Sequence, residues 1–148
     1  MPLKDRIQQA VKDAMRGGDK RRLGTARLIT AAIKQREVDE RIELDDEQIV
    51  LVLDKMCKQR RESLEQYRKA NREDLAEQEE YELGVLKEFL PEPLSEAEID
   101  ALIDAAVTET GAAGIKDMGK VMGILKPQLQ GRADMGAVSA RIKARLGG

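Results

Sequence analysis

The spacing of aliphatic residues constrains the fold of this chain more than any other feature. Leucine, isoleucine, valine, methionine and alanine recur every three or four positions, as in Met118, Val121, Met122, Leu125 and Leu129. This is the period of a helix with one buried face. No segment alternates apolar and polar residues as a half-buried strand does. Only three of the 148 residues are aromatic, so aliphatic side chains must fill the core, as in helix-on-helix packing. The sequence predicts an all-α, multihelical protein.

A proline-containing segment divides this helical pattern into two parts. Leu90 precedes Pro91, and a residue before proline is biased away from the helical conformation, so a helix should end there. Ser95-Glu96-Ala97-Glu98 then has the form of a capping box, which begins a new helix. We therefore predict an N-terminal long-helix domain at residues 1–90 and a small C-terminal three-helix module at residues 94–148.

Capping and turn residues divide these two parts into seven predicted helices. In the N-terminal part the boundaries are Gly17-Gly18, a cap at Asp19, a cap at Asp45 or Asp46, and a break with a new cap at Asn71. In the C-terminal part they are Gly111, a helix start near Ile115, an end or bend at Pro127, a stop at Gly131, and a cap at Asp134.

Charge is distributed unevenly along the chain, although the formal net charge is only −2. Residues 1–36 carry ten Lys and Arg against three Asp, and residues 111–148 carry seven against two. Residues 73–110 hold one Lys against thirteen acidic residues. Such an asymmetry bears on the choice of partner rather than on the fold. Both ends are basic and the middle is acidic, and one interpretation of the acidic segment 73–110 is that it mimics nucleic acid toward a basic partner.

Few residues are suited to catalysis. The chain has no histidine, which is the commonest general base and metal ligand. Cys57 is the single cysteine and lies at the edge of an apolar stripe, so we expect a buried, unreactive thiol. No Walker-type phosphate loop is present. We expect no catalysis by this chain alone, no metal and no small-molecule cofactor.

The apolar segments and the cysteine content of the chain predict a cytoplasmic protein. No apolar run is long enough to span a bilayer, and no secretory signal pattern begins the chain. A single cysteine indicates that the fold uses no disulfide framework, which is typical of a reducing compartment. We therefore expect no membrane partner.

The predicted sixth helix carries the most informative site. At about 100° per residue, Gly119, Lys120 and Gly123 lie within about 60° of Lys116, and the apolar stripe lies on the opposite side. A glycine in a helix interior costs about 1 kcal/mol relative to alanine. Two glycines on an outward face suggest that something approaches the backbone closely. A bare strip flanked by lysines suits a sugar-phosphate backbone.

Other basic residues either extend this site or form a separate candidate for nucleic-acid binding. Arg132, Arg141 and Lys143 would enlarge the patch towards the C-terminus, together with Arg145. The alternative for the two glycines is that they let another helix cross closely, and spacing alone does not decide between these interpretations. A weaker candidate for nucleic-acid binding is the N-terminal basic segment, which contains Lys20, Arg21, Arg22 and Arg27.

Several motifs resemble those of the YqeY-like proteins over essentially the whole chain. The middle of the chain contributes Arg72-Glu73-Asp74-Leu75-Ala76-Glu77, Phe89-Leu90-Pro91 and Leu94-Ser95-Glu96. The C-terminal part contributes Thr110-Gly111, Lys116-Asp117-Met118-Gly119-Lys120-Val121-Met122 and Gly131-Arg132-Ala133-Asp134. The last two motifs are also similar to the tail domain of GatB, the kinase-like component of the glutamyl/aspartyl-tRNA amidotransferase. One departure is Met135, which stands where the family often has glycine.

The resemblance implies an all-helical protein whose C-terminal module contacts tRNA, with Lys116, Gly119, Lys120 and Arg132 as the tRNA-facing residues. We therefore expect a non-catalytic protein that binds tRNA or a tRNA-handling protein. Family members often carry the label of a carbon–nitrogen ligase with glutamine as amide donor, which implies the alternative of an accessory component of an amidotransferase. A protein–protein interaction module is the third interpretation.

Overall fold

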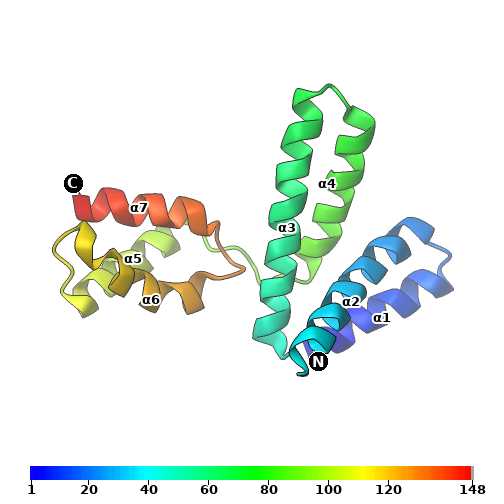
Figure 1. The fold of residues 1–148 in the computed structure, drawn as a ribbon, viewed down its shortest axis with the longest axis horizontal. Helices are drawn as coiled ribbons and strands as arrows, with labels where there is room; N and C mark the ends of the chain where they lie inside the picture. The colour runs from blue at the N-terminus through cyan, green and yellow to red at the C-terminus, as the bar shows by residue number, and fades with distance from the viewer. Residues whose placement is uncertain (148) are drawn as a thin grey trace. The chain divides into compact units, whose positions relative to one another are not determined.

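The computed structural model describes residues 1–147, which form helices and short connections with no strand among them (Figure 1). The elements are α1 (Leu3–Arg16), α2 (Lys20–Glu40), α3 (Asp46–Lys69), α4 (Glu73–Glu88), α5 (Glu96–Thr110), the 3₁₀ turn η1 (Ile115–Asp117), α6 (Met118–Leu129) and α7 (Met135–Gly147). The prediction of an all-α, multihelical fold is confirmed. No helix in the described part of the chain has the length and apolar character to cross a membrane.

Side-chain caps begin four of the helices where the sequence places them, and at α7 the cap is Asp134, which accepts the backbone N–H of Gly136 at 3.0 Å. Asp19 accepts the backbone N–H of Arg22 at the start of α2. Asp45 at the start of α3 and Ser95 at the start of α5 each form a complete capping box. Such caps satisfy amides that have no partner within the helix. Asn71 does not cap α4: it has a left-handed φ of 57° just after α3, and α4 begins after Arg72.

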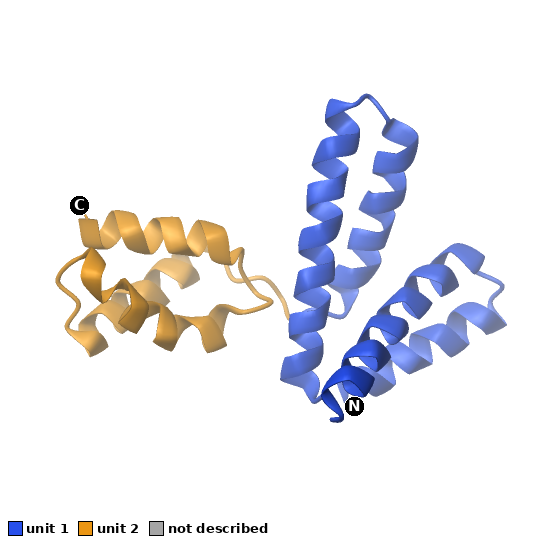
Figure 2. Ribbon diagram, in the orientation of Figure 1, with its two compact units in different colours: residues 1–90 blue, residues 91–148 orange. Residues whose placement is uncertain are grey.

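The chain forms two compact units, Met1–Leu90 and a second unit that begins at Pro91 (Figure 2). The first unit consists of two helical hairpins, α1–α2 and α3–α4, that pack on one core, which is aliphatic apart from Phe89 and Cys57. Ile7, Ile29, Ile49, Leu53 and Leu86 are completely buried in this core. Burial of the apolar stripes is the main source of stability for such amphipathic helices.

Arginines of α2 join the two hairpins of the first unit. Arg21 donates to Glu77 of α4 at 2.9 Å, and its guanidinium lies 4.0 Å from the centre of the Tyr81 ring. Arg22 makes a two-point contact with Glu88 at 2.8 and 3.1 Å. These two residues belong to the N-terminal basic segment that the sequence offered as a weaker nucleic-acid site. Their guanidinium groups contact acidic residues of α4.

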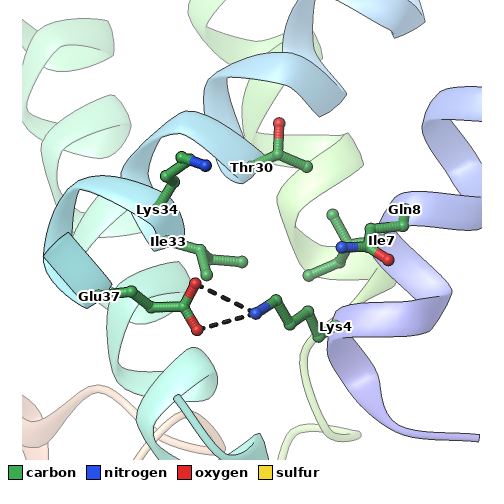
Figure 3. Close-up of a pocket in the computed structure, with 7 residues that line it drawn as sticks. All are labelled: Lys4, Ile7, Gln8, Thr30, Ile33, Lys34 and Glu37. Carbon is green, nitrogen blue, oxygen red and sulfur yellow. Dashed lines mark hydrogen bonds and ion pairs between the residues drawn. The ribbon is translucent and has the colours of Figure 1, made fainter. Parts of the chain in front are cut away.

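An ion pair between α1 and α2 lies beside a cleft of about 220 Å³ (Figure 3). The Lys4 ammonium contacts both carboxylate oxygens of Glu37, at 2.8 and 3.1 Å. Glu37 also accepts the backbone N–H of Leu44 at 2.9 Å. The hydrogen bond from Lys4, followed by that from Leu44, lowers the pKa of Glu37. Glu37 therefore connects α1, α2 and the segment before α3.

The second unit packs α5, α6 and α7 around its own aliphatic core. Val121, Leu125, Leu129, Val138 and Ile142 are buried there. Two hydrogen bonds attach the proline-containing segment to the turn between α6 and α7. Leu94 N–H donates to the Arg132 carbonyl at 2.9 Å, and Arg132 Nε donates to the Glu92 carbonyl at 3.1 Å.

Candidate nucleic-acid interface

The exposed face of α6 carries the two glycines that the sequence singled out. α6 buries Val121, Leu125 and Leu129 on one side, and Gly119, Lys120 and Gly123 are exposed on the other. A Cβ atom built at Gly119 or Gly123 would meet no atom within 4 Å, beyond its neighbours and the backbone of its own helix. No helix of the second unit crosses α6 there. The alternative in which these glycines let a helix of the same unit pack closely is therefore excluded.

Lys116 precedes this face in the chain and does not lie on the α-helix that the sequence predicted. It belongs to η1, and α6 begins only at Met118. The turn per residue in a 3₁₀ helix is about 120° rather than 100°, so the helical-wheel position assigned to Lys116 is wrong. Its side chain is nevertheless exposed, and it directly precedes Asp117.

Asp117 closes the loop that leads into α6. Its carboxylate accepts the Ala113 N–H at 3.0 Å, and this hydrogen bond is the main reason that its pKa is lowered. Asp117 is therefore ionised at neutral pH. Lys120 lies 3.9 Å from it, in a long ion pair whose lysine end is largely exposed. Exposed pairs of this kind contribute little energy, so Lys120 keeps most of its freedom to contact another anion.

Two C-terminal arginines are paired with acidic residues of α5. Arg141 contacts Asp100 at 2.6 Å, and Arg145 contacts Asp104 at 3.0 Å. The sequence analysis extended the predicted patch to both arginines, Arg145 as well as Arg141. The guanidinium group of Arg141 is held on the α5 side of α7, and the adjacent carboxylates offset its charge.

Arg132 also has a role within the protein. Its Nε atom donates to the Glu92 carbonyl, and its own carbonyl accepts from Leu94. Both hydrogen bonds connect the segment before α5 to the turn before α7. Arg132 is partly buried, and its first contribution is to the local fold.

Lys143 lies on a different side of α7 from Arg141. Gly147, one turn further along, faces Ile115 of η1 so closely that an added Cβ would be 3.1 Å from Ile115 Cδ1. At 100° per residue Lys143 lies about 40° from Gly147, so it lies on the η1 side of the unit. Lys143 and Arg141 therefore lie on different sides of α7.

Lys126 is a basic residue that the predicted site omitted. It is exposed three residues after Gly123, on the same face of α6. Among residues 1–147, Lys116, Lys126 and Lys143 form no ion pair within 4.0 Å. The helical spacing from Gly123 would have identified Lys126. We define the α6 face as Lys116, Gly119, Lys120, Gly123 and Lys126.

Comparison with known proteins identifies the family. The family described as Yqey-like protein matches residues 4–146. "Altered inheritance of mitochondria protein 41, mitochondrial" of Pyrenophora tritici-repentis is 34% identical over 145 residues, which cover 96% of this chain and 80% of that protein. The protein of the same name from Lachancea thermotolerans is 37% identical over 106 residues, which cover 70% of this chain and 57% of that protein.

These relatives correct one expectation and confirm another. The expectation of a cytoplasmic protein is contradicted, because the similar proteins are named as mitochondrial. Its basis was weak in physical terms: a single free cysteine shows that no disulfide framework is used, and this does not distinguish one compartment from another. The family resemblance carried by the sequence motifs is confirmed, and the chain belongs to the YqeY-like family.

Proposed function

We propose that this protein binds tRNA through the α6 face and performs no catalysis of its own. The observation that carries the proposal is the empty space over Gly119 and Gly123, beside lysines that other residues leave largely available. Without side chains at these positions, a ligand reaches the helix backbone directly. Lysine ammonium groups then contact phosphates on either side of the strip.

The composition of the second unit indicates which part of the RNA is contacted. Residues 91–148 contain no aromatic residue, so the unit has no surface on which unpaired bases could stack. The available cations are lysines, which act as point charges rather than as planar readers of base edges. The proposed contact is therefore with the sugar-phosphate backbone of a folded RNA, with little dependence on sequence.

Binding should weaken steeply as salt is added. Fluorescence anisotropy of labelled tRNA, titrated with the full chain at several salt concentrations, gives log affinity against log salt. Each phosphate contact contributes about −0.7 to −0.9 to the slope, so three or four lysine contacts predict a slope of about −3. No binding at low salt, or binding that is indifferent to salt, would contradict the proposal.

Charge reversal on the α6 face identifies the surface. The double variant Lys116→Glu/Lys120→Glu should lose affinity for tRNA and have a shallower salt slope. The matched control is Lys55→Glu/Lys58→Glu, which reverses two exposed lysines of α3 that make no ion pair among the described residues. Equal losses for both double variants would show a general effect of net charge and would overturn the assignment to α6.

Filling the glycine strip tests close approach separately from charge. Gly119→Gln and Gly123→Gln leave the net charge unchanged, and both have room for a side chain in the free protein. We expect each to weaken tRNA binding while the circular dichroism spectrum is retained. Arg141→Gln should bind as the unchanged protein does, because Asp100 already holds that guanidinium.

The same strip also suits a helix of a tRNA-handling protein, because small residues let two helices approach closely. This second proposal rests on the same empty space. It predicts that the glutamine variants lose a protein partner that is retained after ribonuclease treatment, with unchanged affinity for tRNA alone. The amidotransferase alternative predicts that glutamine-dependent conversion of mischarged tRNA increases when this chain is added to the enzyme.

A further inference from the structure

α2 has a second face rich in small and apolar residues, and nothing in its own unit covers it. Its inner face buries Ala26, Ile29 and Ile33. On the opposite side, an arc of about 80° has exposed Lys20 at its edge and five further exposed residues, namely Gly24, Leu28, Ala31, Gln35 and Val38. Leu28 is 44% exposed and Val38 is 61% exposed. We call these five residues the outer α2 seam.

The spacing of the outer seam is that of a helix-pairing surface. Its positions follow one another at intervals of four, three, four and three residues, as the apolar positions of a coiled coil do. The seam extends over about 21 Å of helix. A Cβ built at Gly24 would meet no atom within 4 Å, so a partner helix would find the seam open. α1 lies beside this face and not over it, through the Lys4–Glu37 pair and the contact of Arg27 with Met15.

A row of basic residues borders the seam on the α1 side. Lys20, Arg27 and Lys34 are seven residues apart in the sequence and are all exposed. None of the three forms an ion pair within 4.0 Å in the described part of the chain. Figure 3 shows Lys34 beside the Lys4–Glu37 pair with no hydrogen bond or ion pair drawn to it, and its charge helps to lower the pKa of Glu37. Three positive charges therefore line one edge of an apolar strip without an ion-paired acidic residue.

We propose that the outer α2 seam is the docking site for an amphipathic helix of a partner protein that carries acidic residues beside its own apolar stripe. Leu28 and Val38 would pack against that stripe, and Lys20, Arg27 and Lys34 would face its carboxylates. Gly24 and Ala31 let the partner backbone come close. This is the helix-to-helix mode of recognition, in which apolar anchors supply affinity and flanking charges choose the partner.

Charge complementarity at the outer α2 seam disfavours a second copy of this chain as the partner, and the apolar residues of the seam disfavour a nucleic acid. In an antiparallel pair of two copies, the basic rows would face one another and repel. In a parallel pair only one of the three basic residues would face an acid, Asp39, because the other two positions on that flank are Thr25 and Ala32, which carry no charge and pack inside their own unit. A nucleic acid would use the basic row but would gain nothing from Leu28 and Val38. An acidic helix uses both features.

The test uses the full chain and a labelled synthetic helical peptide as the probe. The peptide has leucines at seam spacing and glutamates beside them, and its control has glutamine in place of every glutamate. Fluorescence anisotropy should show binding of the acidic peptide and about tenfold or weaker binding of the glutamine peptide. Leu28→Ser/Val38→Ser and Arg27→Glu/Lys34→Glu should each reduce affinity about tenfold or more. Leu75→Ser, at an exposed leucine of α4, is the matched control and should leave affinity unchanged.

Three further results decide between occupants. Restored binding of the Arg27→Glu/Lys34→Glu protein to a peptide with lysine in place of glutamate would confirm that the basic row faces the partner. A dimer in solution that Leu28→Ser/Val38→Ser dissociates would overturn the proposal in favour of a second copy. The proposal would also be overturned if the peptide fails to bind and the protein binds duplex RNA or vesicles containing anionic phospholipid instead. That binding would have to be lost in the same seam variants.

Discussion

Glu37 connects three segments of the first unit through one carboxylate. Replacing it with glutamine removes the charge that Lys4 contacts, so Glu37→Gln should lower the free energy of unfolding at pH 7. The pKa of Glu37 is lowered in the folded protein from an ordinary value of 4.5. Its ionic contribution is therefore complete above about pH 4.5 and is lost as the pH falls through the lower, folded-state value. Urea denaturation of both proteins should show a difference that shrinks below pH 4.5. Glu62→Gln, at an exposed residue of α3, should show no such difference.

Cys57 is completely buried in the first core, as its place beside an apolar stripe predicts. Burial raises the pKa of this thiol above its usual 9.0, so almost no thiolate is present at neutral pH. We expect no reaction with iodoacetamide in the native protein and full reaction in guanidinium chloride, as measured by mass spectrometry. Rapid labelling of the folded protein would contradict this assignment.

These two residues show what a sequence predicts about single side chains. The burial of Cys57 follows from a local period that is visible within one helix. The pairing of Lys4 with Glu37 does not, because the two residues are 33 positions apart and meet only when α1 and α2 pack. Similarly, the sequence shows that Arg141 is basic, but only the packing of α7 on α5 reveals that Asp100 holds it.

At the level of the helix, the exposed glycines of α6 lower its stability, because glycine in a helix interior is less favourable than alanine. Gly123 is exposed in the helix interior, and a Cβ there has room. Gly123→Ala should therefore raise the free energy of unfolding by about 0.5–1 kcal/mol, as measured by thermal or urea denaturation. A destabilising effect would show that the backbone at this position is under a constraint that the structure does not contain.

Most helix starts were predictable from a single capping residue, and Asn71 before α4 is an exception. Asp19, Asp45 and Ser95 cap helices as expected, because a short polar side chain that accepts a backbone amide is a local signal. Pro127 did not end α6: the helix continues for two residues to Leu129, which is completely buried in the second core. Tertiary packing therefore outweighs the local effect of proline in this last turn.

The outer α2 seam escaped prediction for a related reason. Apolar residues on both faces of α2 weaken the contrast from which an amphipathic stripe is recognised. Only the packed structure separates the inner residues, such as Ile29, from the outer ones, such as Leu28. The 3₁₀ turn before α6 was likewise missed, since it depends on Asp117 closing its own loop at Ala113.

At the scale of the whole chain, each compact unit has a separate core, and the segment before α5 is part of the second one. Two fragments test this division. Residues 91–148 keep the hydrogen bonds of Glu92 and Leu94 with Arg132, and residues 95–148 lose them. With about 0.5–1.5 kcal/mol for each hydrogen bond, the longer fragment should be more stable by about 1–3 kcal/mol in urea denaturation. Glu92→Ala in the longer fragment keeps the backbone carbonyl and should have little effect.

The placement of the aromatic residues has a practical consequence for spectroscopy. Both tyrosines, Tyr67 and Tyr81, belong to the first unit, where the Arg21 guanidinium lies over the Tyr81 ring. The chain has no tryptophan, so its ultraviolet emission originates entirely from residues before Pro91. Melting followed by tyrosine emission and by ellipticity at 222 nm (a wavelength that reports every helix) would thus assign each thermal transition to its half of the polypeptide without any label.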